Sequence, residues 1–133
     1  MILLDTSAVL GYLNDEPGRD VVATVLVSGE ARISLVNQTE VLSKLCDWGM
    51  SFENAKMVLG KLAIPFEAFT AETALEAARL RSLTRAHGLS LGDRACLATA
   101  RLCKLDVLTG DRPWLEMAQI LGLNITNFRP DPH

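Results

Sequence analysis

Short apolar runs alternate along this chain with longer stretches in which apolar residues recur at helical spacing. The apolar runs predict strands at residues 1–4, 31–36, 64–69, 106–109 and 124–128. The intervening stretches predict helices over residues 7–14, 19–28, 38–48, 51–62, 71–87, 91–103 and 111–121. Strands that alternate with helices in this way are typical of an α/β fold with a mostly parallel sheet of four to five strands, covered on both faces.

The composition fits one domain of this kind. The chain has 133 residues, 49% hydrophobic and 22% charged, so we expect a single globular domain spanning residues 1–133. Asp5 interrupts the first apolar run, and no stretch approaches the roughly 20 apolar residues of a membrane span. Neither a secretory signal nor a membrane contact is therefore expected. Three cysteines without CxxC spacing indicate reduced thiols, and hence a cytoplasmic protein.

Net charge leaves a nucleic-acid partner open. The chain carries 16 acidic and 13 basic residues, and its net charge of −3 by itself argues against such a partner. If four of the acids held a metal ion, 12 would remain against 13 basic residues, and the rest of the surface would be nearly neutral. A small catalytic domain can then bind RNA through the metal site and a few arginines.

Four carboxylates are predicted to meet at one edge of the sheet. Asp5 directly follows the first strand, Asp111 lies two residues after the fourth, and Glu40 lies in the first turn of the helix after the second. The carboxyl ends of parallel strands form the edge where ligands bind in such sheets. Asp93 instead lies within a helix, on the same face as a set of apolar residues: Leu89, Cys96, Leu97 and Ala100.

Each acid also has a structural interpretation. Asp5 and Asp111 could cap the helices that follow them, and Glu40 could complete a capping box with Asn37. Asp93 could be a first-turn acid that the helix dipole favours. An aspartate on an apolar stripe is costly without a partner, however, and a cation shared with other carboxylates would be such a partner. The convergence of four acids on one edge favours this shared site.

The ligand types indicate a hard cation. An all-oxygen cluster selects Mg²⁺ or Mn²⁺, and the sequence has no HExxH or CxxC pattern that would suggest zinc. Such clusters suit phosphodiester hydrolysis, because the ion binds a phosphate oxygen, activates water and stabilises the leaving oxygen. The two histidines, His87 and His133, lie at a helix end and in the tail, and neither is expected to be a catalytic base.

The residues around the four acids resemble the PIN-domain family, and in particular the VapC-type toxins of bacterial toxin–antitoxin pairs. Residues 2–7 (ILLDTS) resemble the first strand and acid, and residues 37–41 (NQTEV) the second acid. Residues 88–98 (GLSLGDRACLA) and 107–111 (VLTGD) resemble the third and fourth motifs. The match covers essentially the whole chain. It departs at Ser90, where many relatives have proline, and at Gly110, where relatives often carry a bulkier residue.

This resemblance implies a PIN-like three-layer α/β/α sandwich and an endoribonuclease dependent on Mg²⁺ or Mn²⁺. It also implies a homodimer, inhibited by a cognate VapB-type antitoxin of a type II toxin–antitoxin system. Carried over by position, Asp5 and Asp93 are direct metal ligands, and Asp111 completes the shell directly or through water. Glu40 orients the attacking water or binds a second ion.

Other polar residues flank the acids. The hydroxyls of Thr6, Ser7 and Thr109 are predicted to hydrogen-bond the carboxylates, although helix capping and strand-end contacts would also explain them. Arg94 and Arg112 each follow one of the acids and could clamp RNA phosphates, or could be solvated or ion-paired.

Two further functions are weighed against the ribonuclease. An aspartyl-phosphate phosphohydrolase needs a second aspartate two residues after the first, and position 7 is serine. A non-catalytic PIN-like module that binds RNA or protein stays open, although inactive relatives usually lose acids and this chain keeps all four. RNA cleavage that requires a divalent metal would separate the ribonuclease from both.

Overall fold

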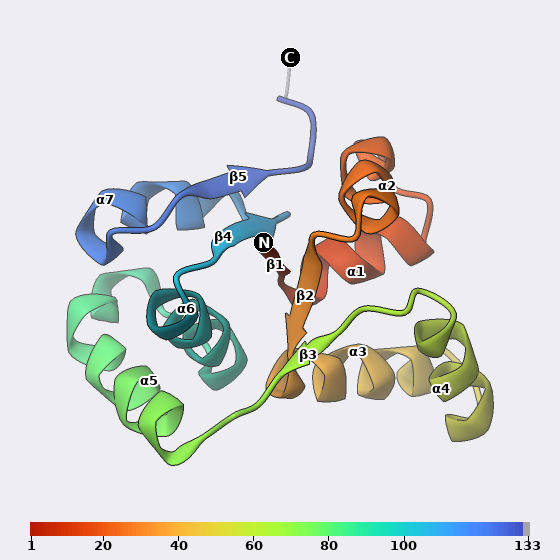
Figure 1. Cartoon of the computed structure of the whole chain (residues 1–133), viewed down its shortest axis with the longest axis horizontal. Helices are drawn as coiled ribbons and strands as arrows, with labels where there is room; N and C mark the ends of the chain where they lie inside the picture. The colour runs from red at the N-terminus through yellow and green to blue at the C-terminus, as the bar shows by residue number, and fades with distance from the viewer. Residues whose placement is uncertain (132–133) are drawn as a thin grey trace.

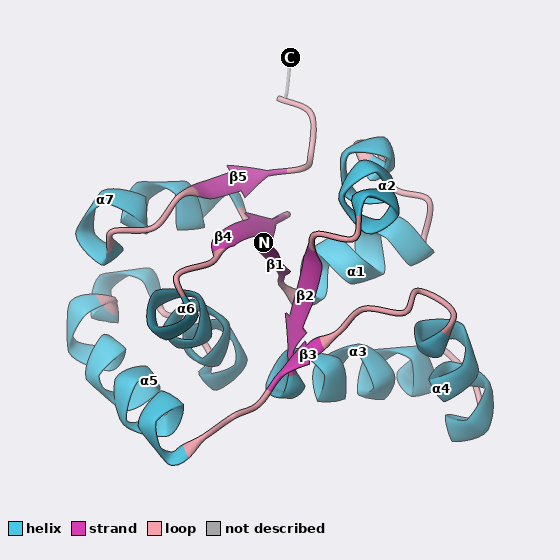
Figure 2. Ribbon diagram, viewed as in Figure 1, coloured by secondary structure: helices cyan, strands magenta, loops and turns pink. Residues whose placement is uncertain are grey.

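A parallel sheet between two helical layers organises the computed structural model, which describes residues 1–131 (Figures 1 and 2). The strands are β1 (Ile2–Leu4), β2 (Ala31–Ser34), β3 (Phe66–Glu67), β4 (Asp106–Thr109) and β5 (Ile125–Asn127). They pair in parallel in the order β3-β2-β1-β4-β5, so the sheet is entirely parallel within these residues. The N-terminal strand therefore lies at the centre of the sheet.

The helices divide between the two faces of the sheet (Figure 1). One layer contains α1 (Thr6–Leu13), α2 (Arg19–Ser28), α3 (Leu35–Asp47) and α4 (Phe52–Gly60). The other contains α5 (Ala71–Leu83), α6 (Leu91–Cys103), the 3₁₀ helix η2 (Arg112–Met117) and α7 (Ala118–Leu121), with a short 3₁₀ turn, η1 (Arg85–His87), before α6. This three-layer α/β/α arrangement is the predicted fold class.

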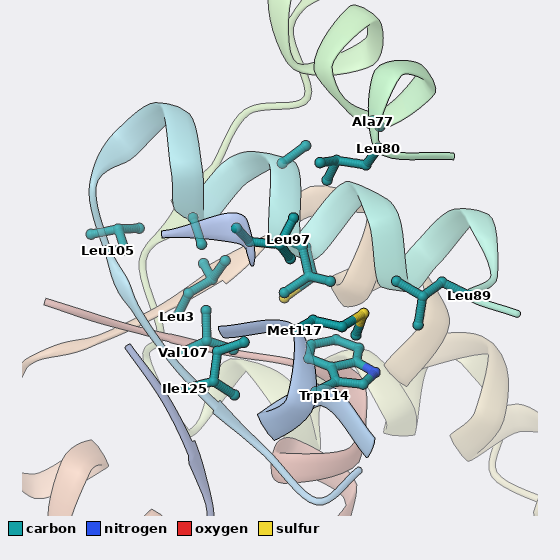
Figure 3. Close-up of a cluster of buried hydrophobic side chains, with 14 residues drawn as sticks. Leu3, Ala77, Leu80, Leu89, Leu97, Leu105, Val107, Trp114, Met117 and Ile125 are labelled. Atoms are coloured by element: carbon teal, nitrogen blue, oxygen red, sulfur yellow. The ribbon is translucent and has the colours of Figure 1, made fainter. Parts of the chain in front are cut away.

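Alternation along β1 and β4 produces two separate cores. Leu3 and Val107 face the α5–α6 side, where they pack with Leu97 and Trp114 (Figure 3). Their neighbours in the strands face the opposite layer, in a second core that includes Leu4, Ile33, Val41, Leu45 and Leu108. Because successive residues of a strand point to opposite faces, a parallel strand buried on both sides is apolar at every position.

The register of the sheet aligns the strand ends. Leu4 pairs with Ile33 of β2 and with Leu108 of β4. The residue after each therefore lies at the same level of the carboxyl edge, which brings Asp5 beside Thr109. The first and fourth predicted strands, which placed Asp5 and Asp111, are in this way confirmed. The strand predicted over 31–36 ends at Ser34, so Glu40 lies in the second turn of α3 and not in its first.

Several predicted boundaries are wrong. Helix α3 begins at Leu35, because the hydroxyl of Ser34 accepts the backbone N–H of Asn37 and caps the helix there. The helix predicted over 71–87 ends at Leu83, and the one predicted over 111–121 is η2 followed by one turn of α7.

No helix within residues 1–131 is long and apolar enough to cross a membrane. The prediction made for His133 lies outside the described residues.

Leu97→Ala tests the first core. Leu97 is fully buried at the centre of α6, so its truncation leaves a cavity and is expected to lower the free energy of unfolding by about 2–5 kcal/mol. Leu75→Ala is the matched control, because Leu75 lies on α5 with 74% of its surface exposed. A urea titration of both variants measures the difference, and equal losses would contradict this description of the core.

Candidate active site

The four predicted acids line a single cavity at the carboxyl edge of the sheet. Its volume is about 480 Å³, and its walls come from α1, α3, the first turn of α6 and the residue pair after β4. Asp5, Glu40, Asp93 and Asp111 all line it, together with Lys44 and several hydroxyl side chains. Residues far apart along the chain therefore deliver their carboxylates to one place.

Asp5 is a buried carboxylate held by three donors. Only 4% of its surface is exposed. Thr109 Oγ1 donates to Oδ2 at 2.6 Å, while Ser7 Oγ and the backbone N–H of Ala8 donate to Oδ1 at 2.7 and 2.9 Å. Burial, with a smaller contribution from the charge of Asp93, raises the pKa of Asp5 to about 6 against the lowering effect of these bonds. Asp5 thus caps α1 and faces the cavity at once.

Glu40 is oriented by two polar residues. Thr6 Oγ1 donates to Glu40 Oε1 at 2.6 Å, and Asn37 Nδ2 donates to the same oxygen at 2.9 Å. The predicted capping box between Asn37 and Glu40 is wrong, because α3 begins one turn earlier at its cap Ser34. Asn37 is itself buried and accepts the Ser34 hydroxyl, so it is a positioning residue that the sequence analysis missed.

Gly92 lets α6 approach the Glu40 carboxylate. A Cβ at position 92 would lie 2.1 Å from Oε2 of Glu40 and 2.5 Å from its carboxyl carbon. Any side chain there would displace the carboxylate that Thr6 and Asn37 hold. The signal in the sequence was a glycine in the first turn of a helix, a position where glycine carries an energetic cost.

Asp93 is less buried than predicted. Its backbone N–H donates to Ser90 Oγ and its Oδ2 accepts the N–H of Ser90, both at 3.1 Å, which makes a capping box at the start of α6. The Asp93 side chain is only half-buried, so the expectation of a carboxylate buried on the apolar stripe is wrong. The capping contact uses one carboxylate oxygen of a side chain that still lines the cavity.

Asp111 lies on the exposed rim of the cavity. Its backbone N–H donates to Thr109 Oγ1 at 3.0 Å. Its side chain makes no capping hydrogen bond to η2 within residues 1–131, so the structure does not give it the capping role that position alone suggested. Partial burial and the charge of Asp93 raise the pKa of Asp111.

Hydroxyl groups connect the acids to the sheet. Thr109 is fully buried, donates to Asp5 and accepts the backbone N–H of Asp111. Ser7 likewise donates to Asp5 and accepts the backbone N–H of Gly110 at 2.7 Å. These two side chains therefore fix the segment after β4 against the start of α1, which sets the position of Asp111 relative to Asp5.

A family comparison agrees with this geometry. The model of the PIN domain matches residues 2–120, a segment that includes all four acids. This chain belongs to the PIN domain family. A search of curated proteins finds no match.

Solved structures share the PIN fold at low sequence identity. A chain of VapBC2 from Rickettsia felis, bound to a DNA fragment from its promoter, is 18% identical with a TM-score of 0.74, covering 96% of this chain and 98% of that one. A toxin–antitoxin complex from Klebsiella pneumoniae matches at 21% identity and a TM-score of 0.74, covering 98% and 100%. FitAcB from Neisseria gonorrhoeae is 24% identical with a TM-score of 0.69, and the match covers 96% of this chain and 98% of that one. These likenesses establish the fold.

The two arginines that follow acids in this PIN domain have protein partners. Arg94 Nη1 donates to the carbonyl oxygen of Ala77 in α5 at 2.9 Å, and its Nε is buried without a hydrogen-bond partner among residues 1–131. The guanidinium of Arg94 is therefore directed toward α5, and its contact with RNA stays a prediction. Arg112 pairs with Asp131 at 3.0 Å and is 44% exposed, so its contact with RNA stays a prediction.

The donor set of this PIN domain fits a hard cation. Its acidic side chains offer only oxygen ligands, and burial, with a smaller contribution from the charge of Asp93, raises the pKa of Asp5 and of Asp111. Within residues 1–131, no three His, Cys, Asp or Glu side chains are close enough to hold one ion as they stand. The carboxylates therefore surround the cavity without forming a closed ligand set.

The buried charge of Asp5 predicts a pH dependence of stability. The folded chain keeps the Asp5 proton up to about pH 6, whereas the unfolded chain loses it near the ordinary aspartate pKa of 3.8. Stability is therefore lost as pH rises through this window, by roughly 3 kcal/mol at about 1.4 kcal/mol per pKa unit. The Asp5→Asn variant has no carboxyl group to ionise at this position and so does not lose stability in this way. Its free energy of unfolding relative to wild type is therefore expected to increase between pH 4 and pH 7.5.

Urea titrations at the two pH values, with EDTA present, measure this difference. Asp106→Asn, at the exposed amino end of β4, is the matched control. An Asp5→Asn effect that is equal at both pH values would contradict a raised Asp5 pKa.

Proposed function

We propose that this chain is a metal-dependent endoribonuclease that hydrolyses RNA phosphodiester bonds. The observation that carries the proposal is the convergence of four carboxylates, from the ends of β1 and β4, the second turn of α3 and the first turn of α6, on one cavity. A single capping or packing role does not explain this convergence, since the capping contacts of Asp5 and Asp93 use atoms that leave both side chains on the cavity wall.

Mg²⁺ or Mn²⁺ is the proposed cofactor. Asp5, Asp93 and Asp111 would hold it, and Glu40 would either bind a further ion or orient the attacking water. The ion would supply Lewis acidity toward the phosphate and lower the pKa of water. Rotation of the exposed side chains of Asp111 and Asp93 would bring their oxygens toward Asp5, whose own carboxylate is fixed by Thr109 and Ser7.

The protein side chains have separate tasks in this proposal. The three donors to Asp5 hold its carboxylate in one orientation, and Thr6 and Asn37 hold Glu40 through Oε1. Oε2 of Glu40 then accepts a hydrogen bond from the attacking water and aligns it with the phosphorus. Lys44 lies one helical turn beyond Glu40 on the same cavity wall, so we assign it a contact with the RNA backbone.

The biological setting is proposed from the relatives. The structures that share this fold include VapBC and other toxin–antitoxin complexes. We propose that residues 1–133 form one PIN-like domain that acts in the cytoplasm as the VapC-type toxin of a type II toxin–antitoxin system. In this proposal the chain is a homodimer, and a VapB-type antitoxin inhibits it.

Cleavage of labelled RNA tests the catalytic proposal. Wild type with Mn²⁺ is expected to cut a set of structured and single-stranded RNAs, and EDTA is expected to abolish cutting. Asp93→Asn is expected to reduce the rate at least 100-fold, the scale for loss of a group that organises charge in the transition state. Asp106→Asn, the same change at the opposite end of β4, is expected to leave the rate unchanged. RNA left intact by wild type would favour a non-catalytic binding module instead.

Expression in bacteria tests the proposed toxin role. Induction of the wild-type chain alone is expected to arrest growth, because an active ribonuclease without its inhibitor degrades cellular RNA. Asp93→Asn, made at the same level, is expected to leave growth normal. Colony counts after induction measure the effect, and growth arrest by both chains would point to a cause other than cleavage.

A further inference from the structure

The segment after β5 packs back against the residues that follow β4 and places an arginine beside Gly110. Phe128 is 2% exposed, and its backbone N–H donates to the carbonyl of Thr109 at 3.0 Å. Arg129 follows it, and its backbone N–H is bound by Asn127 Oδ1 at 3.0 Å. The chain therefore places Arg129 beside the residues that link Thr109 to Asp111.

Three contacts hold the Arg129 guanidinium. Its Nε donates to the carbonyl oxygen of Gly110 at 2.9 Å, and its Nη1 forms an ion pair with Glu16 in the turn before α2. Its central carbon lies 4.9 Å from the centroid of the Phe128 ring. The remaining nitrogen, Nη2, makes no hydrogen bond to residues 1–131 as described, and 38% of the side chain is exposed.

Gly110 makes room for this arrangement. A Cβ at position 110 would lie 2.7 Å from Nε of Arg129 and 2.6 Å from the Phe128 ring. Gly110 is not among the glycines with a left-handed backbone, so space is the reason for glycine at this position. Because Gly110 immediately precedes Asp111, the guanidinium lies against the backbone of a cavity acid.

The positive charge of Arg129 also affects the ionisation of Asp111. Arg129 is the cationic side chain that lowers the pKa of Asp111, in opposition to partial burial and to Asp93. The other arginines near the acids are directed elsewhere, since Arg94 binds α5 and Arg112 pairs with Asp131. Lys44 lines the cavity on the α3 side, so Arg129 and Lys44 lie on different elements around the four acids.

We propose that Arg129 binds a backbone phosphate of the RNA strand, next to the scissile phosphate on the Asp111 side of the cavity. The exposed Nη2 donates to a phosphate oxygen, while Gly110 and Glu16 fix the orientation of the guanidinium. Arg129 is thus a positioning residue that offsets the repulsion between RNA and the acids. The inference rests on the proposed ribonuclease function, and Arg129 lies outside the residues that the PIN domain model matches.

The alternative role for Arg129 is structural. The ion pair with Glu16 and the bond to Gly110 also fasten the C-terminal segment to the α1–α2 turn. A purely structural arginine would change stability, but it would not change how RNA binding depends on salt. The salt dependence of binding therefore separates the two roles, because each phosphate contact contributes about 0.7 to the slope for single-stranded nucleic acid.

Binding of a labelled single-stranded RNA, followed by fluorescence anisotropy with Mn²⁺ in the Asp93→Asn background, is the test. Adding Arg129→Gln is expected to weaken binding roughly five- to tenfold and to reduce the slope of log Kd against log salt by about 0.7. Arg129→Lys is expected to keep most of the slope.

Arg101→Gln is the matched control. Arg101 is also paired with a glutamate, Glu76, but lies toward the far end of α6. It is expected to leave Kd and slope unchanged. An unchanged slope in Arg129→Gln would overturn the inference, even where wild type cleaves RNA. A reduced slope would support it even if wild type cut no RNA, and failure of the Asp93→Asn chain to bind any RNA would overturn it.

Discussion

The carboxylate of Asp5 is buried at the end of the central strand, and a buried carboxylate needs hydrogen-bond donors. Those donors come from β4 through Thr109 and from the first turn of α1 through Ser7 and the N–H of Ala8. The side chain of Asp5 therefore links the pairing of β1 with β4 to the start of α1. The same two hydroxyls accept the N–H groups of Gly110 and Asp111, so the fourth acid is placed by the contacts of the first.

The acids that form the site lower the stability of the metal-free fold. Asp5 is ionised at neutral pH against the effect of its burial, and Asp93 adds repulsion to both Asp5 and Asp111. A divalent cation would remove this repulsion and stabilise the folded chain by binding it alone. The capping box at Ser90 and the contacts of Thr6 and Asn37 with Glu40 reduce the freedom of the acids without neutralising them.

The sequence allowed prediction of the positions that follow from strand order. It did not allow prediction of the partners that long side chains find in the folded chain. Asp5 and Asp111 were placed at the carboxyl edge because parallel strands end there, and the register bears this out. The start of α3 was placed one turn late because Asn37 and Ser34 both have the chemistry of a cap. Arg94 and Arg129 show the larger limit, since long side chains find their partners only after distant helices and turns have packed.

The contact between Asp5 and Thr109 joins residues separated by 104 positions in the chain. Synthesis by the ribosome therefore produces the central strand well before its neighbour β4 and the acid that follows it. A nascent chain has β1 and β2 but lacks half of the carboxylate cavity. A chain that stops before α6 therefore lacks Asp93 and Asp111 and cannot form the four-carboxylate cavity.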